Sequence, residues 1–121
     1  MAATSFTDLR VWQASHRATL EVYRITRSFP AEERFGLSIQ MRRAAVSIGA
    51  NIAEGFGRRR PRDKARLYNI GEGSAEDLKN LLLVARDLGY AKEMDALWKA
   101  LEDISRMLRG LVDKTLDAPV P

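Results

Sequence analysis

The side chains best suited to chemistry are a single histidine and a short run of arginines. His16 is the only histidine of the chain, and the sequence contains no cysteine. A serine nucleophile needs a positioned base, and a metal site needs several converging ligands. Neither a Glu-x-x-His pair nor a serine–histidine motif surrounds His16. We therefore expect no enzyme activity, no metal and no other cofactor, and we expect His16 to be a core or interface residue.

Positive charge is concentrated in the segment 58–66. Its nine residues carry six basic and one acidic side chain, a net +5, whereas residues 1–57 carry +2 and residues 67–121 carry −3. Clustered cations repel one another and oppose the macrodipole at a helix N-terminus, so the cluster does not help folding. The alternative explanation is a run of charges that is simply solvated at the surface. An anionic partner, however, explains both the density of the positive charges and their position at the start of a helix. Phosphates of RNA or DNA fit, because each phosphate contact releases a counterion. The residues predicted to bind nucleic acid are Arg42, Arg43, Arg58, Arg59, Arg60, Arg62, Lys64 and Arg66.

A polar stripe precedes this cluster. Ser47, Asn51 and Glu54 follow one another at intervals of three or four, which places them on one helix face. In one interpretation the stripe borders a site in which Arg43 or Arg58 meets phosphate. In the other, the stripe satisfies backbone groups and Glu54 pairs with an arginine. The structural interpretation is favoured for the three stripe residues, and both stay open for the arginines.

Four helices must position these residues. Prolines occur only at positions 30, 61, 119 and 121, where they mark borders rather than helix interiors. Apolar periodicity predicts helices over residues 7–28, 37–54, 62–88 and 92–116, in one domain of residues 1–116 with a flexible tail at 117–121. Thr7 is the expected N-cap of the first helix, and Gly55 and Gly89 the expected stops of the second and third. No apolar run approaches the roughly 20 residues that span a bilayer, and no signal peptide is visible. We therefore expect a cytoplasmic protein.

The first two helices are apolar on two sides, whereas the last two have one apolar stripe each. A four-helix monomer covers only one side of each helix, and soluble monomers rarely leave a contiguous apolar strip exposed. The second sides therefore predict contacts between subunits; the alternative is a helix sunk more deeply into its own core. The residues expected at the oligomer interface are Val11, Ala14, Ala18, Val22, Ile25, Ile39, Val46, Ala50 and Ala53.

Several of these segments together resemble a known family. They are Phe6-Thr7-Asp8-Leu9-Arg10-Val11-Trp12-Gln13, Phe29-Pro30, Gly36-Leu37, Gln40-Met41-Arg42-Arg43-Ala44-Ala45, Ser47-Ile48, Asn51-Ile52-Ala53-Glu54-Gly55, Gly57-Arg58 and Gly73-Ser74. The family is the four-helix bundle proteins first noticed in intervening sequences of bacterial 23S ribosomal RNA genes. The resemblance implies an antiparallel up-down-up-down bundle that assembles as a ring of five subunits. It also implies kinship with the accessory variability proteins of diversity-generating retroelements, which bind nucleic acid and a reverse transcriptase.

The chain departs from the family pattern at two places. Gly49 stands where the family often has proline, and Arg59, Arg60 and Arg62 make the connection after the second helix more basic than usual. The leading hypothesis is an all-α, non-catalytic homo-oligomer, most simply a pentamer, that binds RNA or DNA through this connection. The alternative is a protein-interaction scaffold or accessory subunit for a reverse transcriptase or ribonucleoprotein.

Overall fold

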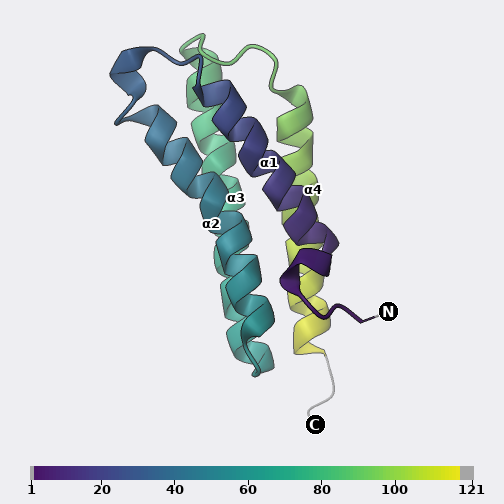
Figure 1. The fold of residues 1–121 in the computed structure, drawn as a ribbon. Helices are drawn as coiled ribbons and strands as arrows, with labels where there is room; N and C mark the ends of the chain where they lie inside the picture. Colours follow the sequence, from purple (N-terminus) through teal and green to yellow (C-terminus); the bar gives the residue numbers. More distant parts are fainter. Residues whose placement is uncertain (1, 118–121) are drawn as a thin grey trace.

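Four α-helices make up most of the computed structural model, which describes residues 2–117 (Figure 1). No strand occurs in that range. The helices are α1 (Arg10–Thr26), α2 (Leu37–Gly57), α3 (Pro61–Asp87) and α4 (Asp95–Leu116), with short 3-10 turns η1 (Phe6–Asp8) and η2 (Ala31–Glu33). The expectation of an all-α fold with four helices is confirmed. Most of the tail predicted after Leu116 lies outside the described residues.

Successive helices run in opposite directions and pack side by side as a bundle (Figure 1). The Ser47 and Ser74 hydroxyls lie 2.8 Å apart between α2 and α3, and the Ser105 hydroxyl donates to Glu76 between α4 and α3. The Thr19 hydroxyl reaches the Ala45 carbonyl at 3.2 Å and so joins α1 to α2. No hydrogen bond or ion pair between α1 and α4 accompanies these contacts within residues 2–117.

The first helix begins later than the sequence predicts. Ser5, not Thr7, accepts the capping hydrogen bond, and the Asp8 carboxylate accepts the Ser5 backbone amide in return. This reciprocal capping box encloses a 3-10 turn, which satisfies backbone donors before the α-helical path starts at Arg10. The prediction of Thr7 as N-cap is therefore wrong by two residues.

Gly55 does not end α2, although Gly89 does end α3. Gly89 has φ +80°, the left-handed conformation that favours glycine after a helix. Gly55 is helical and buried. A Cβ at this position would lie 2.7 Å from Cε1 of the Tyr68 ring, so no larger residue fits without a shift. The glycine is needed for close packing of α3 against α2, and α2 continues to Gly57.

The core side of α1 is the side that the sequence assigned to other subunits. Val11, Ala18 and Val22 are buried within the single subunit, which corrects that expectation for these three residues. Two hydroxyl residues, Ser15 and Thr26, interrupt the same stripe in the sequence and hide its apolar character. Both are buried because their hydroxyls donate to carbonyls of their own helix, at 2.7 and 2.8 Å.

The α2–α3 turn and the C-terminal end of α4 lie at the same end of the bundle (Figure 1). A shallow hollow there is lined by residues of α3 and α4, among them Arg62 and Leu116. The connections from α1 to α2 and from α3 to α4 lie at the opposite end (Figure 1). No helix in residues 2–117 is long and apolar enough to cross a membrane.

Candidate nucleic-acid interface

Only three residues, Arg58, Arg59 and Arg60, connect α2 to α3. Pro61 occupies the first position of α3, where its missing amide hydrogen costs nothing. Arg58 and Arg60 adopt extended backbone conformations, as expected before proline in the case of Arg60. A connection this short cannot fold back on the bundle, so its side chains project into solvent. All three arginines are exposed.

Most cations at this end have no acidic partner. Arg58 donates to Glu54 at 2.9 Å, one helical turn earlier, and both side chains are about half exposed. The other exposed arginines of the segment 58–66 make no ion pair and no side-chain hydrogen bond with any residue of the described part of the chain. We call these four residues the arginine cluster: Arg59, Arg60, Arg62 and Arg66.

Lys64 does not belong to the arginine cluster. Its Nζ donates to the Phe56 carbonyl at 2.7 Å and lies 3.4 Å from the Gly55 carbonyl. These carbonyls belong to the last turn of α2, where a cation also meets the negative end of the macrodipole. Burial lowers the pKa of Lys64. Lys64 thus closes the C-terminus of α2, and its contact with phosphate stays a prediction.

Arg42 and Arg43 lie on α2, away from the arginine cluster. The 14 residues from Arg43 to Gly57, the last residue of α2, rise about 21 Å along the helix. Arg42 is half-buried: its Nε donates to the Thr26 hydroxyl at 2.8 Å, and its guanidinium lies 4.7 Å from the centre of the Tyr23 ring. Arg43 is exposed. The eight predicted cations thus do not form one surface, and Arg42 joins α2 to α1.

The polar stripe is used within the fold. The Asn51 amide donates to the Ser47 carbonyl at 2.8 Å and lies 3.1 Å from the Ser47 hydroxyl, which in turn meets Ser74 of α3. Glu54 is the partner of Arg58. The arginine partner of Glu54 is the kind that the structural interpretation named, whereas the backbone group bonded by Asn51 is the Ser47 carbonyl within α2 and not a group of the turn. The ion pair with Glu54 also leaves the positive charge of Arg58 partly neutralised.

A hollow beside the arginine cluster was missed by sequence reasoning. It encloses about 460 Å³ between α3 and the end of α4, and its lining includes Arg62, Arg66 and Asn69. Ile70 and Leu116 also line it, with 44% and 51% of their surface exposed. The available signal was the spacing of Arg62 and Arg66, which places two cations on the same face beside Ile70.

An apolar surface covers the outer side of the α1–α2 seam. Leu20, Tyr23 and Val46 expose 58%, 36% and 48% of their surface. His16 is also exposed and stacks on the partly buried Trp12, with ring centroids 4.8 Å apart. We call this surface the seam face. Four residues predicted at the oligomer interface, Ile39, Val46, Ala50 and Ala53, are exposed or half-buried on α2.

The other two interface residues predicted on α1 lie elsewhere. Ala14 and Ile25 are half-buried and line a groove between α1 and α4. The exposed apolar residues of α1 are instead those that the sequence assigned to the opposite side. Within residues 2–117, no cluster of three or more acidic or histidine side chains is arranged to hold a metal ion.

Comparisons with known proteins agree with this architecture. The model of a family described as 23S rRNA-intervening sequence protein matches residues 7–110. No curated protein matches the chain. A crystal structure of a protein with unknown function from the S23 ribosomal protein family of Bacteroides thetaiotaomicron is similar, with a TM-score of 0.78 and 21% sequence identity. The similarity covers 85% of this chain and 95% of that one, and it supports the fold alone.

Proposed function

Because this chain belongs to the family of 23S rRNA-intervening sequence proteins, we propose that it is a non-catalytic homo-oligomer that binds the phosphate backbone of RNA or DNA. The arginine cluster carries the proposal. Its four guanidinium groups project from one end of the bundle and have no anionic partner in the described part of the chain. Arginine suits phosphate because its planar donors meet two oxygens at once.

The chemistry of the cluster favours recognition of backbone over sequence. No exposed aromatic ring interleaves the arginines to provide a stacking platform for bases. Exposed cations on a short turn and on the first turns of α3 instead read the spacing of phosphates and the shape of the helix or loop that carries them. RNA is the first ligand to test, because the family description refers to ribosomal RNA.

Oligomerisation through the seam face would repeat the arginine cluster in every subunit. The exposed side chains of Leu20, Tyr23 and Val46 give this face its apolar character, and burying them against a second copy removes apolar surface from water. Several weak phosphate sites on one particle then act together, which raises the overall affinity without any new contact. The ring of five implied by the family resemblance is the assembly we propose.

The proposal is tested by replacing the four residues of the arginine cluster with serine and measuring binding to a structured RNA and a DNA duplex by fluorescence anisotropy. Each phosphate contact contributes about 0.9 to the slope of log K against log salt for duplex DNA. Removing four contacts per engaged subunit therefore lowers that slope by about 3.6. Far-ultraviolet circular dichroism and light scattering check that fold and assembly are unchanged.

A matched control removes the same charge elsewhere. Arg27, Arg34, Arg86 and Lys99 are exposed and lie outside the basic end. Serine at these four positions lowers the net charge equally but should leave most of the affinity and the salt slope in place. If both quadruple variants lose the same affinity, binding follows net charge and the assignment to the arginine cluster fails.

The second candidate function is a scaffold or accessory subunit that binds a protein, such as a reverse transcriptase or a ribonucleoprotein component. The groove between α1 and α4 favours it, because the groove lies apart from the arginine cluster and has both apolar and charged walls. Pull-down before and after nuclease treatment separates the two functions. A protein partner remains bound after digestion, whereas a partner held through nucleic acid is lost.

A further inference from the structure

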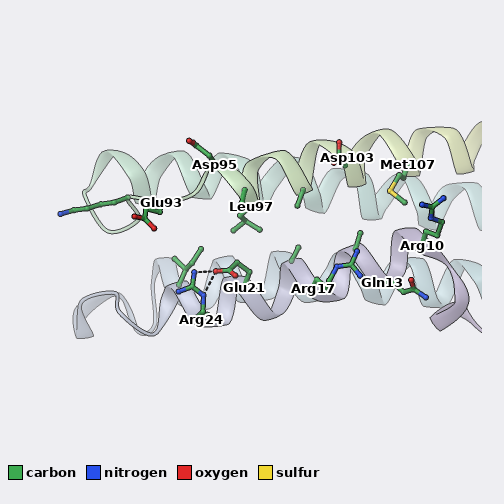
Figure 2. Close-up of a pocket in the computed structure, with 16 residues that line it drawn as sticks. Arg10, Gln13, Arg17, Glu21, Arg24, Glu93, Asp95, Leu97, Asp103 and Met107 are labelled. Carbon is green, nitrogen blue, oxygen red and sulfur yellow. Dashed lines mark hydrogen bonds and ion pairs between the residues drawn. The ribbon is translucent and has the colours of Figure 1, made fainter.

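A large hollow of the described chain is a groove between α1 and α4. It encloses about 950 Å³, and Figure 2 shows side chains of both helices along it. Its floor is built of small or flexible apolar residues: Ala14, Ala18, Ile25, Leu97, Ala100 and Met107. Alanines allow a helix backbone to approach closely, and methionine adapts its shape to what it meets. The floor therefore suits a helix with a narrow apolar stripe.

The two walls of the groove carry opposite net charge, because three arginines outnumber Glu21 on α1 and three carboxylates outnumber Lys92 on the α4 side. Arg10, Arg17 and Arg24 recur every seven residues along α1, so neighbouring arginines rise about 10.5 Å along one side of the helix. On the other wall Glu93 lies just before α4, Asp95 is the first residue of α4, and Asp103 lies two turns further along. Figure 2 shows Arg10, Arg17 and Arg24 on the α1 side together with Glu21, and Glu93, Asp95 and Asp103 on the α4 side, where Asp95 and Asp103 lie at the outer edge of α4.

These opposite charges do not meet one another. Glu21 pairs with Arg24 on the same helix, and Asp103 pairs with Arg106 on the same helix. No ion pair crosses from α1 to α4 in residues 2–117. The two sides are thus opposite in net charge, and no ion pair joins them in the described residues. A helix lying along the groove would meet both.

The charge balance of the groove distinguishes it from the arginine cluster. Its lining holds four cations (Arg10, Arg17, Arg24, Lys92) and four anions (Glu21, Glu93, Asp95, Asp103), so it has no net attraction for a polyanion. The distance from Arg10 to Arg24 along α1 is about 21 Å, or four helical turns. An elongated groove of this length, with an apolar floor and charged walls, matches the helix-in-groove mode of protein recognition.

We propose that the α1–α4 groove binds an amphipathic helix of a second protein. The bound helix spans about four turns. It places a narrow apolar stripe on the alanine floor, acidic residues at intervals of seven beside α1, and basic residues beside α4. The site is independent of nucleic-acid binding, and it lies on a different side of α1 from the seam face, which carries His16, Leu20 and Tyr23.

The test uses three hydrocarbon-stapled 21-residue helical peptides that share one alanine and leucine stripe. One peptide has an acidic edge and a basic edge, the second has two acidic edges, and the third has two basic edges. Fluorescence anisotropy with the full chain should show the mixed-edge peptide binding at least tenfold more tightly than either of the others. Equal binding of all three, or no binding of the mixed-edge peptide at 100 µM or below (roughly a −5.5 kcal/mol threshold), overturns the proposal.

Protein variants locate the site. The Arg10→Glu, Arg17→Glu double variant gives the α1 wall the charge of the α4 wall. It should lose at least tenfold affinity for the mixed-edge peptide and gain affinity for the peptide with two basic edges. That exchange of preference cannot come from damage to the fold. If the double variant keeps the wild-type order of preference, the α1 wall does not face the bound helix and the proposal fails.

A blocking substitution separates a protein partner from a second copy of this chain. Ala100→Trp fills the groove floor and should abolish peptide binding, whereas Ala31→Trp, on the exposed turn η2, should not. Both variants should keep the assembly mass of the wild type and its binding to nucleic acid. A change of assembly mass with Ala100→Trp alone shows that the groove holds another subunit, which overturns the proposal and leaves the arginine cluster untouched.

Discussion

Lys64 and Arg66 are two cations one half-turn apart on α3 that the structure separates by role. Lys64 donates to the last carbonyls of α2, whereas Arg66 is exposed and has no acidic partner in the described chain. Replacing either residue with methionine removes one positive charge from the same end of the bundle. The pair therefore distinguishes a structural cation from a binding cation at constant net charge.

The cost of Lys64→Met follows from its contacts. A hydrogen bond to a charged group contributes about 1.5–3 kcal/mol, and a cation at a helix C-terminus adds about 0.3–1 kcal/mol. Lys64 is only half-buried, so water replaces part of what is lost. We expect a loss of about 2 kcal/mol in the free energy of unfolding, which corresponds to a fall of about 8 °C in Tm at about 4 °C per kcal/mol for this size.

Arg66→Met should leave the free energy of unfolding within about 0.5 kcal/mol of wild type, as surface substitutions do. It should lower the slope of log K against log salt for duplex DNA by about 0.9 for each subunit engaged. Urea unfolding at fixed protein concentration and salt-titrated anisotropy measure the two effects. If Lys64→Met lowers the salt slope as much as Arg66→Met without loss of stability, the assignment of Lys64 to the α2 terminus is refuted.

Three further outcomes are expected. Gly55→Ala should lose about 1 kcal/mol of unfolding free energy in urea, because overpacking against Tyr68 outweighs the gain in helix propensity. Gly73→Ala has open space around the new Cβ and should gain about 0.5–1 kcal/mol in the same measurement. The double variant Leu20→Glu, Val46→Glu should reduce the mass in light scattering to that of the 13.6 kDa subunit, and an unchanged mass would exclude the seam face as the interface. Two backbone amides donate to the Asp8 carboxylate and lower its pKa. The stabilising effect of Asp8 is therefore present at neutral pH and is lost as pH falls through the lowered pKa. An NMR titration midpoint at or above the ordinary 3.8 would contradict this.

The helices could be predicted from the sequence because prolines and glycines bound them and apolar residues recur at helical spacing. Gly89 ends α3 as predicted, because this role depends only on its own left-handed backbone conformation. Gly55 could not be interpreted in the same way, because its role depends on Tyr68, which comes from another helix. A glycine that allows close packing and a glycine that ends a helix look alike in one sequence.

The orientation of α1 was beyond sequence reasoning for a related cause. Both sides of the helix are apolar in the sequence, and the buried side contains Ser15 and Thr26, whose hydroxyls bond to their own helix. Residue type alone counts these positions as polar. The arginine cluster was predictable from its density, but the separate role of Lys64 depends on the carbonyls of the α2 terminus, which only the tertiary structure brings within its reach.

The location of the α4 end has a practical consequence for experiments on this protein. Leu116 lines the same hollow as Arg62 and Arg66, so an affinity tag or fusion partner joined directly after Leu116 starts beside the arginines. An oligohistidine or acidic tag there would alter the local charge and change apparent affinities. Labels for fluorescence or surface capture are better attached in the connection between α3 and α4, at the far end of the bundle (Figure 1).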